Sequence, residues 1–310
     1  AGVDFRLATS TFRESNNLEL SGFLLWNTYP LDPGDNLAYG LQLDYPNDGW
    51  EGRLGFSEVQ PNHDPAIGFT PRRGFRGYNP QLAFAPRPNS HDWIRQTTFG
   101  VDADLRTDMK NRLLTRIVDV TALGLEMQSQ DSFEVHVIPS YERLEGDFEI
   151  HPGLVLPAGL EATFTRYKIE GRTANRRVLA TTSSVEFGNF FTGEREQVIL
   201  NLAVRPRPGV VVNIENEWNR VSLLEGRFET RLTRLIADTQ FSPWIYLVNN
   251  IQFDSVSDSV GWQFRLRWIV EPGNDLYFVY TQNWRDDLAL DRFVTQDRRG
   301  AAKFVYTFRY

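Results

Sequence analysis

Hydrophobic and polar residues alternate one by one along much of this chain, and its last eight residues show the pattern most clearly. Successive side chains of a β-strand point to opposite faces, so this alternation predicts a strand with two chemically different faces. Because the chain stops on this aromatic stripe, no later strand can cover the stripe, whereas membrane lipid would cover it. We therefore predict the closing strand of a transmembrane β-barrel. Its lipid face would comprise Phe304, Tyr306, Phe308 and Tyr310, opposite Lys303, Thr307 and Arg309.

The same period of two recurs in earlier segments, and helical spacing is hard to find. Over 261–271, for example, Phe264 and Leu266 stand on either side of Arg265. The pattern predicts an all-β fold, an antiparallel up-and-down transmembrane β-barrel of about 16 to 18 strands, with more if strands precede Ala1. Similar alternation runs through 3–10, 37–45, 197–205 and 276–283.

Composition narrows the alternatives. The mean hydropathy of −0.40 and the 41% of hydrophobic residues look like those of a soluble protein, but only every second residue of a barrel strand faces lipid. No run of about eighteen apolar residues is present, which excludes a membrane-spanning helix. A net charge of −7 argues against nucleic acid as a partner. The absence of cysteine fits an envelope protein without requiring one.

Turn lengths suggest how the strands are oriented, because outer-membrane barrels have tight periplasmic turns and longer outer loops. With Tyr310 in the periplasm, the longer connections near 61–74, 145–158 and 285–300 would lie outside. The count is about seventeen strands, whereas bacterial barrels usually have an even number. We therefore expect 1–310 to be one barrel domain, the C-terminal part of a longer precursor. The short turns lie at Pro46 to Gly49, Pro86 to Asn89, Pro206 to Gly209, Ser242-Pro243 and Pro272-Gly273.

The eight tryptophans give a nearly independent test, because interfacial rings prefer the headgroup level and form two girdles around a barrel. All eight fall near the ends of predicted strands. Soluble sandwiches also carry tryptophan at strand edges, and Trp244 has the opposite parity from its strand. The predicted periplasmic girdle is Trp50, Trp93, Trp244 and Trp268, and the outer girdle is Trp26, Trp218, Trp262 and Trp284.

Charged residues of both signs occupy positions predicted to face the lumen. A barrel of about sixteen or more strands is too wide for its own side chains to fill, so water or a plug must occupy it. The predicted lumen residues are Arg205, Arg265, Arg267, Lys303 and Arg309, neighboured by Glu215 and Glu217, and, earlier in the chain, Asp102, Asp104, Glu134 and His136.

An arginine-rich outer loop follows the segment 61–68. Guanidinium groups suit phosphate or carboxylate recognition, so this loop could bind lipopolysaccharide phosphates or fold inward and constrict a pore. The alternative that we favour is a rigid loop whose arginines pair with acidic lumen residues such as Asp102 and Asp104. The three arginines are Arg72, Arg73 and Arg76.

Ordered motifs along nearly the whole chain carry a family resemblance. They are Leu37-Ala38-Tyr39-Gly40-Leu41, Asp44-Tyr45-Pro46-Asn47-Asp48, Asp64-Pro65-Ala66-Ile67-Gly68-Phe69-Thr70-Pro71-Arg72-Arg73-Gly74, Trp268, Pro272-Gly273-Asn274-Asp275-Leu276-Tyr277 and Thr307-Phe308-Arg309-Tyr310. With them the chain resembles the C-terminal region of a bacterial family of unknown function. Its members carry an N-terminal carbohydrate-binding-family-9-like domain before a predicted outer-membrane barrel. The chain departs from that family in lacking the N-terminal domain and the first barrel strands. The resemblance implies a fold and a location in the bacterial outer membrane, and no reaction.

Catalysis has weak support in the sequence. The four histidines show no metal-ligand spacing, and no Gly-x-Ser-x-Gly elbow or cysteine nucleophile is present. His136 is the most interesting, because it should face the lumen beside Glu134, Ser140 and Glu142, where a hydrolytic site is conceivable. A polar lumen wall explains the same residues. We therefore assign no catalytic residue, metal or cofactor, and regard an enzyme as the weaker hypothesis.

The sequence leaves three functions open. The first function is a pore or uptake channel for polar solutes. The companion domain of the family suggests that these solutes are related to carbohydrates. The others are an outer-membrane hydrolase and a non-transporting anchor that displays loops or a periplasmic domain. The expected partners are outer-membrane lipid and lipopolysaccharide, and the barrel-assembly machinery, which would read Tyr306, Phe308 and Tyr310 in the closing strand.

Overall fold

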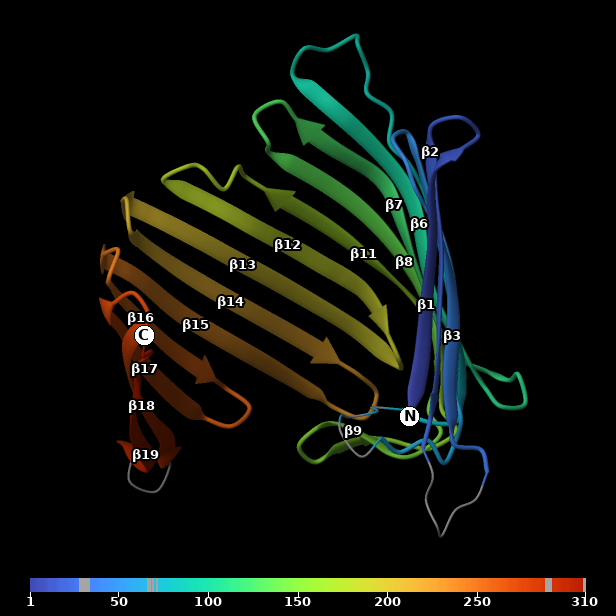
Figure 1. Ribbon diagram of the computed structural model, residues 1–310. Coiled ribbons are helices and arrows are strands. Elements are labelled where there is room, and N and C mark those ends of the chain that lie inside the picture. The colour runs from blue at the N-terminus through green and yellow to red at the C-terminus, as the bar shows by residue number, and fades with distance from the viewer. Residues whose placement is uncertain (28–33, 66–67, 69, 71, 288–291, 309–310) are drawn as a thin grey trace. The chain divides into compact units, whose positions relative to one another are not determined.

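The computed structural model of the chain describes residues 1–27, 34–65, 68, 70, 72–287 and 292–308. Over these residues the secondary structure consists of nineteen β-strands, seventeen of them in one sheet and two in a separate hairpin (Figure 1). Successive strands pair antiparallel. The predicted all-β, up-and-down architecture and its number of strands are confirmed. No helix of the described ranges is long and apolar enough to cross a membrane.

The chain divides into two compact units. The first comprises Ala1–Ile169, Phe187–Glu194 and Leu223–Gly226, and the second Glu170–Glu186, Arg195–Ser222 and Arg227–Tyr310. Strands β11 (Glu161–Arg172), β12 (Leu179–Phe190) and β13 (Gly193–Arg207) contribute residues to both. The first unit also holds β1 (Gly2–Phe12), β2 (Asn16–Trp26), β3 (Leu37–Pro46), β4 (Trp50–Val59), β5 (Phe75–Phe84), β6 (Ile94–Asp108), β7 (Leu113–Met127), β8 (Ser132–Arg143), β9 (Phe148–His151) and β10 (Leu154–Leu156). The second holds β14 (Val210–Ser222), β15 (Arg227–Ser242), β16 (Ile245–Asp254), β17 (Ser259–Glu271), β18 (Asn274–Asp287) and β19 (Arg292–Val305).

In the first unit, the strand register gathers apolar side chains on one face of the sheet. Leu7 pairs with Leu20, and the row continues through Leu43 and Leu54 to Pro80. This apolar face is open, since 64% of Leu7 and 61% of Leu54 are exposed. The opposite, polar face carries a row of hydrogen-bonding residues at the alternate positions, Glu19, Asp44, Arg53, Gln81, Asp102 and Asp119.

A glycine on the apolar face accepts an aromatic ring from the neighbouring strand. Gly22 pairs with Phe5 across β1 and β2, and a Cβ atom at Gly22 would lie 2.7 Å from Phe5 Cε1 and 2.8 Å from Leu41 Cδ2. The ring therefore occupies the space that a larger residue would need, an arrangement that compensates a glycine within a strand. The apolar face remains continuous at this position.

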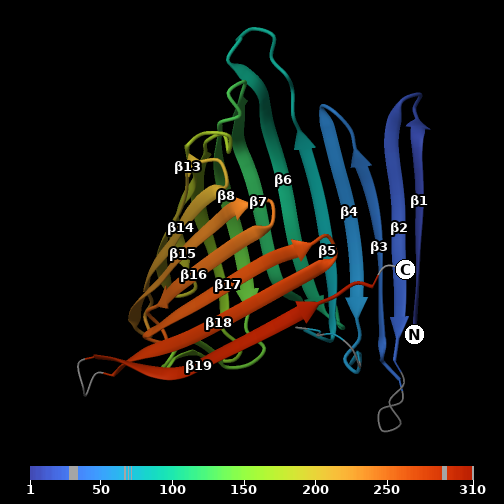
Figure 2. The same ribbon diagram turned by 60° about the vertical axis from the view of Figure 1, so that its left-hand side comes forward.

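The second unit repeats the segregation in the strands β14 to β19, which Figure 2 shows as successive neighbours. Leu266 pairs with Leu247 on one side and with Phe278 on the other, which gives an apolar row. The adjacent Arg265 pairs with Val248 and Val279 on the polar face. The turn at Gly273 closes β17 and β18 with φ of 94°, a conformation that favours glycine.

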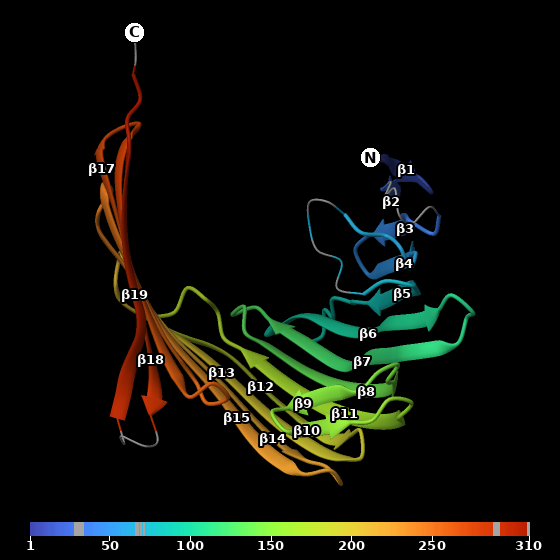
Figure 3. The same cartoon turned by 90° about the horizontal axis from the view of Figure 1, so that it is seen from below.

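The connection between β8 and β11 forms the separate hairpin β9–β10, which Figure 3 shows beside these two strands. Phe148 and Ile150 of the hairpin line the same pocket as Ser140 and Phe164, so apolar groups of this connection lie against the end of the sheet. Leu156 is fully buried. The segment that we expected to be a long outer loop, 145–158, is thus a packed element.

Two predictions about the C-terminal region are wrong. β19 ends at Val305, so Tyr306 and Phe308 lie beyond the closing strand, and Arg309 and Tyr310 lie outside the described residues. The reason is the register: Val305 pairs with Asp275, the second residue of β18, so only Asn274 remains on that strand beyond this pair. Thr307 instead donates to the Gly273 carbonyl oxygen at 2.7 Å.

The predicted long connection at 285–300 is instead mostly strand, since β18 runs to Asp287 and β19 begins at Arg292; residues 288–291 lie outside the described ranges. The alternation of apolar residues is weak in this segment, but the backbone pairing of β18 and β19 continues. Polar side chains of the two strands also contact each other. Asn283 Nδ2 donates to Asp297 Oδ1 at 2.6 Å, and Gln282 Nε2 donates to Thr295 at 3.2 Å.

Leu156 provides a test of the packed hairpin. Leu156→Ala should lower the free energy of unfolding by about 2–5 kcal/mol, because a fully buried leucine leaves a cavity. Val155→Ala is the matched control; Val155 is 47% exposed, and the change should cost within about 0.5 kcal/mol. Urea titration of protein refolded into lipid vesicles, followed by tryptophan fluorescence, measures both. Equal losses would contradict the packing role of Leu156.

Candidate functional site

The polar face of the first unit carries a chain of ion pairs. Arg6 Nη2 lies 2.6 Å from Glu19 Oε2, and Arg53 Nε lies 2.7 Å from Asp44 Oδ1. Gln42 donates to the other Asp44 oxygen at 2.6 Å. Charge-assisted hydrogen bonds of this kind are shorter and stronger than neutral ones. Alternate positions of β1 to β4 therefore form a polar face whose charges compensate each other.

The acidic residues predicted at inner positions lie on this polar face. Asp104 accepts from Arg106 Nη2 at 2.8 Å. Asp102 stands between Gln81 and Asp119 in the register of β5, β6 and β7. The sequence pattern thus predicted the face of both aspartates, but not their neighbours.

His136 lies between two carboxylates and is 8% exposed. Its Nδ1 atom is 2.7 Å from Asp119 Oδ1, and its Nε2 atom is 3.2 Å from Glu134 Oε2. Ser140, the nucleophile that a hydrolase would need, donates to the Ile138 carbonyl oxygen at 3.4 Å. A general base needs a ring nitrogen within reach of the nucleophile, whereas both nitrogens here contact carboxylates. The arrangement is that of an anchored histidine in a polar wall.

The three arginines predicted in an outer loop all have carboxylate partners. Arg76 is the second residue of β5 rather than a loop residue. Its partner Glu58 is only 4% exposed, so this ion pair is built into the sheet. None of the partners is Asp102 or Asp104, which we had suggested. The pairs are Arg72 with Glu145 at 3.0 Å, Arg73 with Asp64, and Arg76 with Glu58 at 2.7 Å.

The polar face of the second unit uses arginine and amide groups together. Arg234 Nη1 lies 3.2 Å from Glu215 Oε2, while its Nε and Nη2 atoms donate to Gln252 Oε1 at 3.1 and 3.0 Å. Glu217 accepts from Gln197 at 2.7 Å. One arginine thus links three strands and fixes the orientation of a glutamine amide.

The predicted cluster of lumen arginines differs in its pairing. Arg267 Nη2 lies 3.3 Å from Asp275 Oδ2, whereas Arg265 Nη2 donates to the neutral Gln263 Oε1 at 3.2 Å. The Nη1 atom of Arg205 is buried without a hydrogen-bond partner among the described residues. Of these three arginines, Arg267 is thus the one with a carboxylate partner among the described residues, whereas Arg265 contacts a neutral amide.

The remaining predicted residues have the following places. Lys303 stands opposite Tyr277 in the β18–β19 register, and Arg309 lies outside the described residues. Exposed aromatic rings of Tyr306 and Phe308 pack edge to face at 4.6 Å. Four tryptophans lie at a strand end or next to one: Trp26, Trp50, Trp93 and Trp244. Another three lie within a strand at a distance of three residues from its end: Trp262, Trp268 and Trp284. Trp218 lies four residues from the end of β14.

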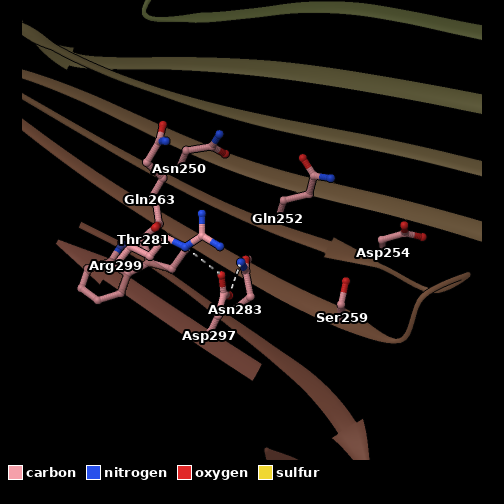
Figure 4. A pocket seen from close by; sticks show the side chains of 11 residues that line it. Asn250, Gln252, Asp254, Ser259, Gln263, Thr281, Asn283, Asp297 and Arg299 are labelled. Carbon is pink, nitrogen blue, oxygen red and sulfur yellow. Dashed lines mark hydrogen bonds and ion pairs between the residues drawn. The ribbon is translucent and has the colours of Figure 1, made fainter. Parts of the chain in front are cut away.

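Sequence reasoning missed a polar pocket of about 460 Å³ on β16 to β19 (Figure 4). Its lining includes Asn250, Gln252, Gln263, Asn283 and Asp297. The sequence signal for this pocket was the alternation of polar and apolar residues, because the lining residues occupy the polar positions of four successive strands. Only the register shows that they lie side by side.

Metal ligands are not grouped in the part of the chain that the structure describes. No set of three or more histidine, cysteine, aspartate or glutamate residues there could hold a metal ion.

Comparison with known proteins adds little to this description. No protein-family model matches the chain, and no curated protein matches its sequence. One solved structure that matches is the in-vitro-folded trimer form of OmpT, an outer membrane protein of Vibrio cholerae, with a TM-score of 0.27 and 10% sequence identity over 98% of this chain and 99% of that chain. We carry nothing over from OmpT at that TM-score.

Proposed function

We propose that this protein is a bacterial outer-membrane β-barrel that forms a pore for polar solutes. The observation that carries the proposal is the segregation of faces within each unit. One face bears exposed leucine and aromatic side chains, and the other bears paired charges and amides. A protein in water buries such an apolar face, whereas a membrane barrel turns it toward lipid.

The ends of the apolar strands support the same orientation. Trp50 and Trp93 at strand ends of the first unit are 51% and 55% exposed, as expected of rings at the headgroup level. The lipid and lipopolysaccharide of that membrane would then be the partners of the apolar face. Tyr306 and Phe308, exposed beyond β19, remain our candidates for recognition by the barrel-assembly machinery.

A water-filled lumen follows from the composition of the polar face. The ion pairs Arg53–Asp44 and Arg234–Glu215 involve partly exposed side chains, and such pairs are stable beside water rather than in a dry core. A barrel of about sixteen or more strands encloses more space than its side chains fill. Carbohydrate-related solutes, suggested by the resemblance to the family with the carbohydrate-binding domain, are part of the proposal.

Two other functions have less support. A hydrolase would need His136 to reach a nucleophile, but its ring nitrogens contact Asp119 and Glu134. An anchor without transport would need no particular chemistry on its polar face. Conductance in planar bilayers separates the pore from both alternatives: the pore proposal fails if the folded protein never conducts.

The lipid-facing assignment has its own test. Leu266→Arg should lower the free energy of unfolding by ~2–4 kcal/mol, because it places a charge on the apolar face within a strand. Arg265→Leu, one residue away on the polar face, should cost much less. Folding titrations in lipid vesicles measure both variants. The opposite ranking would show that the polar face, not the apolar one, contacts lipid.

The unequal pairing of the two arginines predicts unequal effects on ion selectivity. Arg265→Gln should shift the reversal potential in asymmetric salt toward cation preference, because it removes a charge with a neutral partner from a confined channel. Arg267→Gln should shift it less, because Asp275 already offsets that charge. Equal shifts, or none in a conducting protein, would reject the role of Arg265.

A further inference from the structure

The pocket on β16 to β19 is built from two adjacent rows of polar side chains. Asn250, Gln263, Thr281 and Arg299 occupy consecutive register positions across the four strands, and Gln252, Gly261, Asn283 and Asp297 occupy the next row. Figure 4 shows both rows on the same side of the sheet. Gly261 leaves a gap in the second row, so the pocket has its floor at a position without a side chain.

Charged neighbours determine which way the amides of this pocket point. Arginine only donates, so Gln252 and Gln263 must turn their oxygens toward Arg234 and Arg265. Among the described residues, no acceptor then contacts either Nε2 atom. Two amide donors are thereby left available on the polar face.

The acceptor side is fixed in the same way. Asp297 accepts from Asn283 Nδ2 at 2.6 Å, so the amide oxygen of Asn283 points elsewhere. That oxygen is the atom that a Cβ at Gly261 would meet, at 3.0 Å, which places it over the floor of the pocket. The Thr281 hydroxyl lines the same pocket and can both donate and accept.

The charged side chains of the pocket already have contacts of their own. Asp254 already accepts from the Val256 amide at 2.8 Å and from Ser257 at 3.1 Å. Asp297 Oδ2 lies 3.7 Å from Arg299 Nε. Beside these charges, the neutral groups without a partner among the described residues are two amide donors, the Thr281 hydroxyl and two amide oxygens, those of Asn283 and of Asn250, whose Oδ1 atom is buried.

We propose that this pocket is a subsite for a neutral polyhydroxylated solute, such as a sugar. Neighbouring hydroxyl groups each donate and accept, which matches the mixed set of fixed amides and the Thr281 hydroxyl. The volume of about 460 Å³ is within the range of small-molecule sites. The inference rests on the proposed pore only in taking this face to be bathed by water.

We expect this pocket to bind a sugar weakly. Most of the lining consists of polar side chains, and Trp262, which also lines the pocket, belongs to the apolar parity of β17. A dissociation constant on the order of millimolar is therefore expected for a single sugar. Such affinity suits a conduction pathway, in which a solute must bind well enough to enter and weakly enough to leave.

Saturation-transfer NMR with D-glucose and the detergent-purified full chain tests the subsite without requiring conductance. Glucose should show saturation transfer, and Gly261→Val should weaken binding about tenfold by filling the floor. Gln263→Leu should weaken it about five- to tenfold, the loss of one or two hydrogen bonds. The control is Gln282→Leu, the same change on the apolar parity of β18, which should leave binding unchanged. Heat-modifiable mobility in gels confirms that each variant is folded.

The failures of the two proposals can be told apart. A folded, conducting protein that shows no transfer from glucose overturns the subsite and leaves the pore. A non-conducting protein that binds glucose, and loses that binding in Gly261→Val, overturns the pore and supports the subsite. Binding that Gly261→Val does not weaken, or that is tighter for the anion gluconate than for glucose, overturns the subsite as stated.

Discussion

The rest of this structure depends on the pairing of backbone N–H and C=O groups between successive antiparallel strands. Pairing fixes the register, and the register decides which side chains share a face, because a slip of one residue would exchange the faces. The row from Leu7 to Pro80 and the row from Glu19 to Asp119 exist only because five or more strands keep the same parity. Within hydrocarbon the same pairing is obligatory, since an unpaired backbone group there costs several kcal/mol.

Arginine has two different tasks on the polar faces. In the first unit Arg6 and Arg53 pair with carboxylates, which compensates charge and leaves the wall polar. In the second unit Arg234 and Arg265 contact glutamine oxygens, so they orient neutral groups as well. The same side-chain type therefore gives one wall of paired charges and another with directed amide donors.

The sequence predicted the all-β fold and its faces because a period of two is a local property. Phe264, Arg265 and Leu266 reveal their faces without knowledge of any other strand. The end of β19 was not predictable in this way, because the alternation continues to Tyr310 while the partner strand begins at Asn274. The polar ends of β18 and β19, where Asn283 contacts Asp297, were not predicted either. There the strands stay paired although the alternation of apolar residues has stopped.

Candidate sites were harder to predict than faces, because they depend on distances between strands. His136 looked like a possible base from its neighbours in sequence, and Asp119, seventeen residues earlier, completes its surroundings. The outer-loop arginines were expected to pair with lumen acids such as Asp102 and Asp104, whereas the register and the loops bring Arg76 to Glu58 and Arg72 to Glu145. Asn250, Gln263 and Asn283 are unremarkable in sequence and become a pocket only when four strands align them.

The position of Arg265 links charge selectivity to solute recognition within the proposed pore. Its guanidinium group is the feature that holds the Gln263 oxygen and so turns the amide donor outward. Without the Arg265 guanidinium, the Gln263 amide is free to rotate by half a turn, because its oxygen and nitrogen ends are nearly equal in size. The positive field of Arg265 and the hydrogen-bonding direction of Gln263 therefore arise from one contact. A channel built in this way cannot change its preference among ions at this position without also changing how it presents hydrogen bonds to a neutral solute.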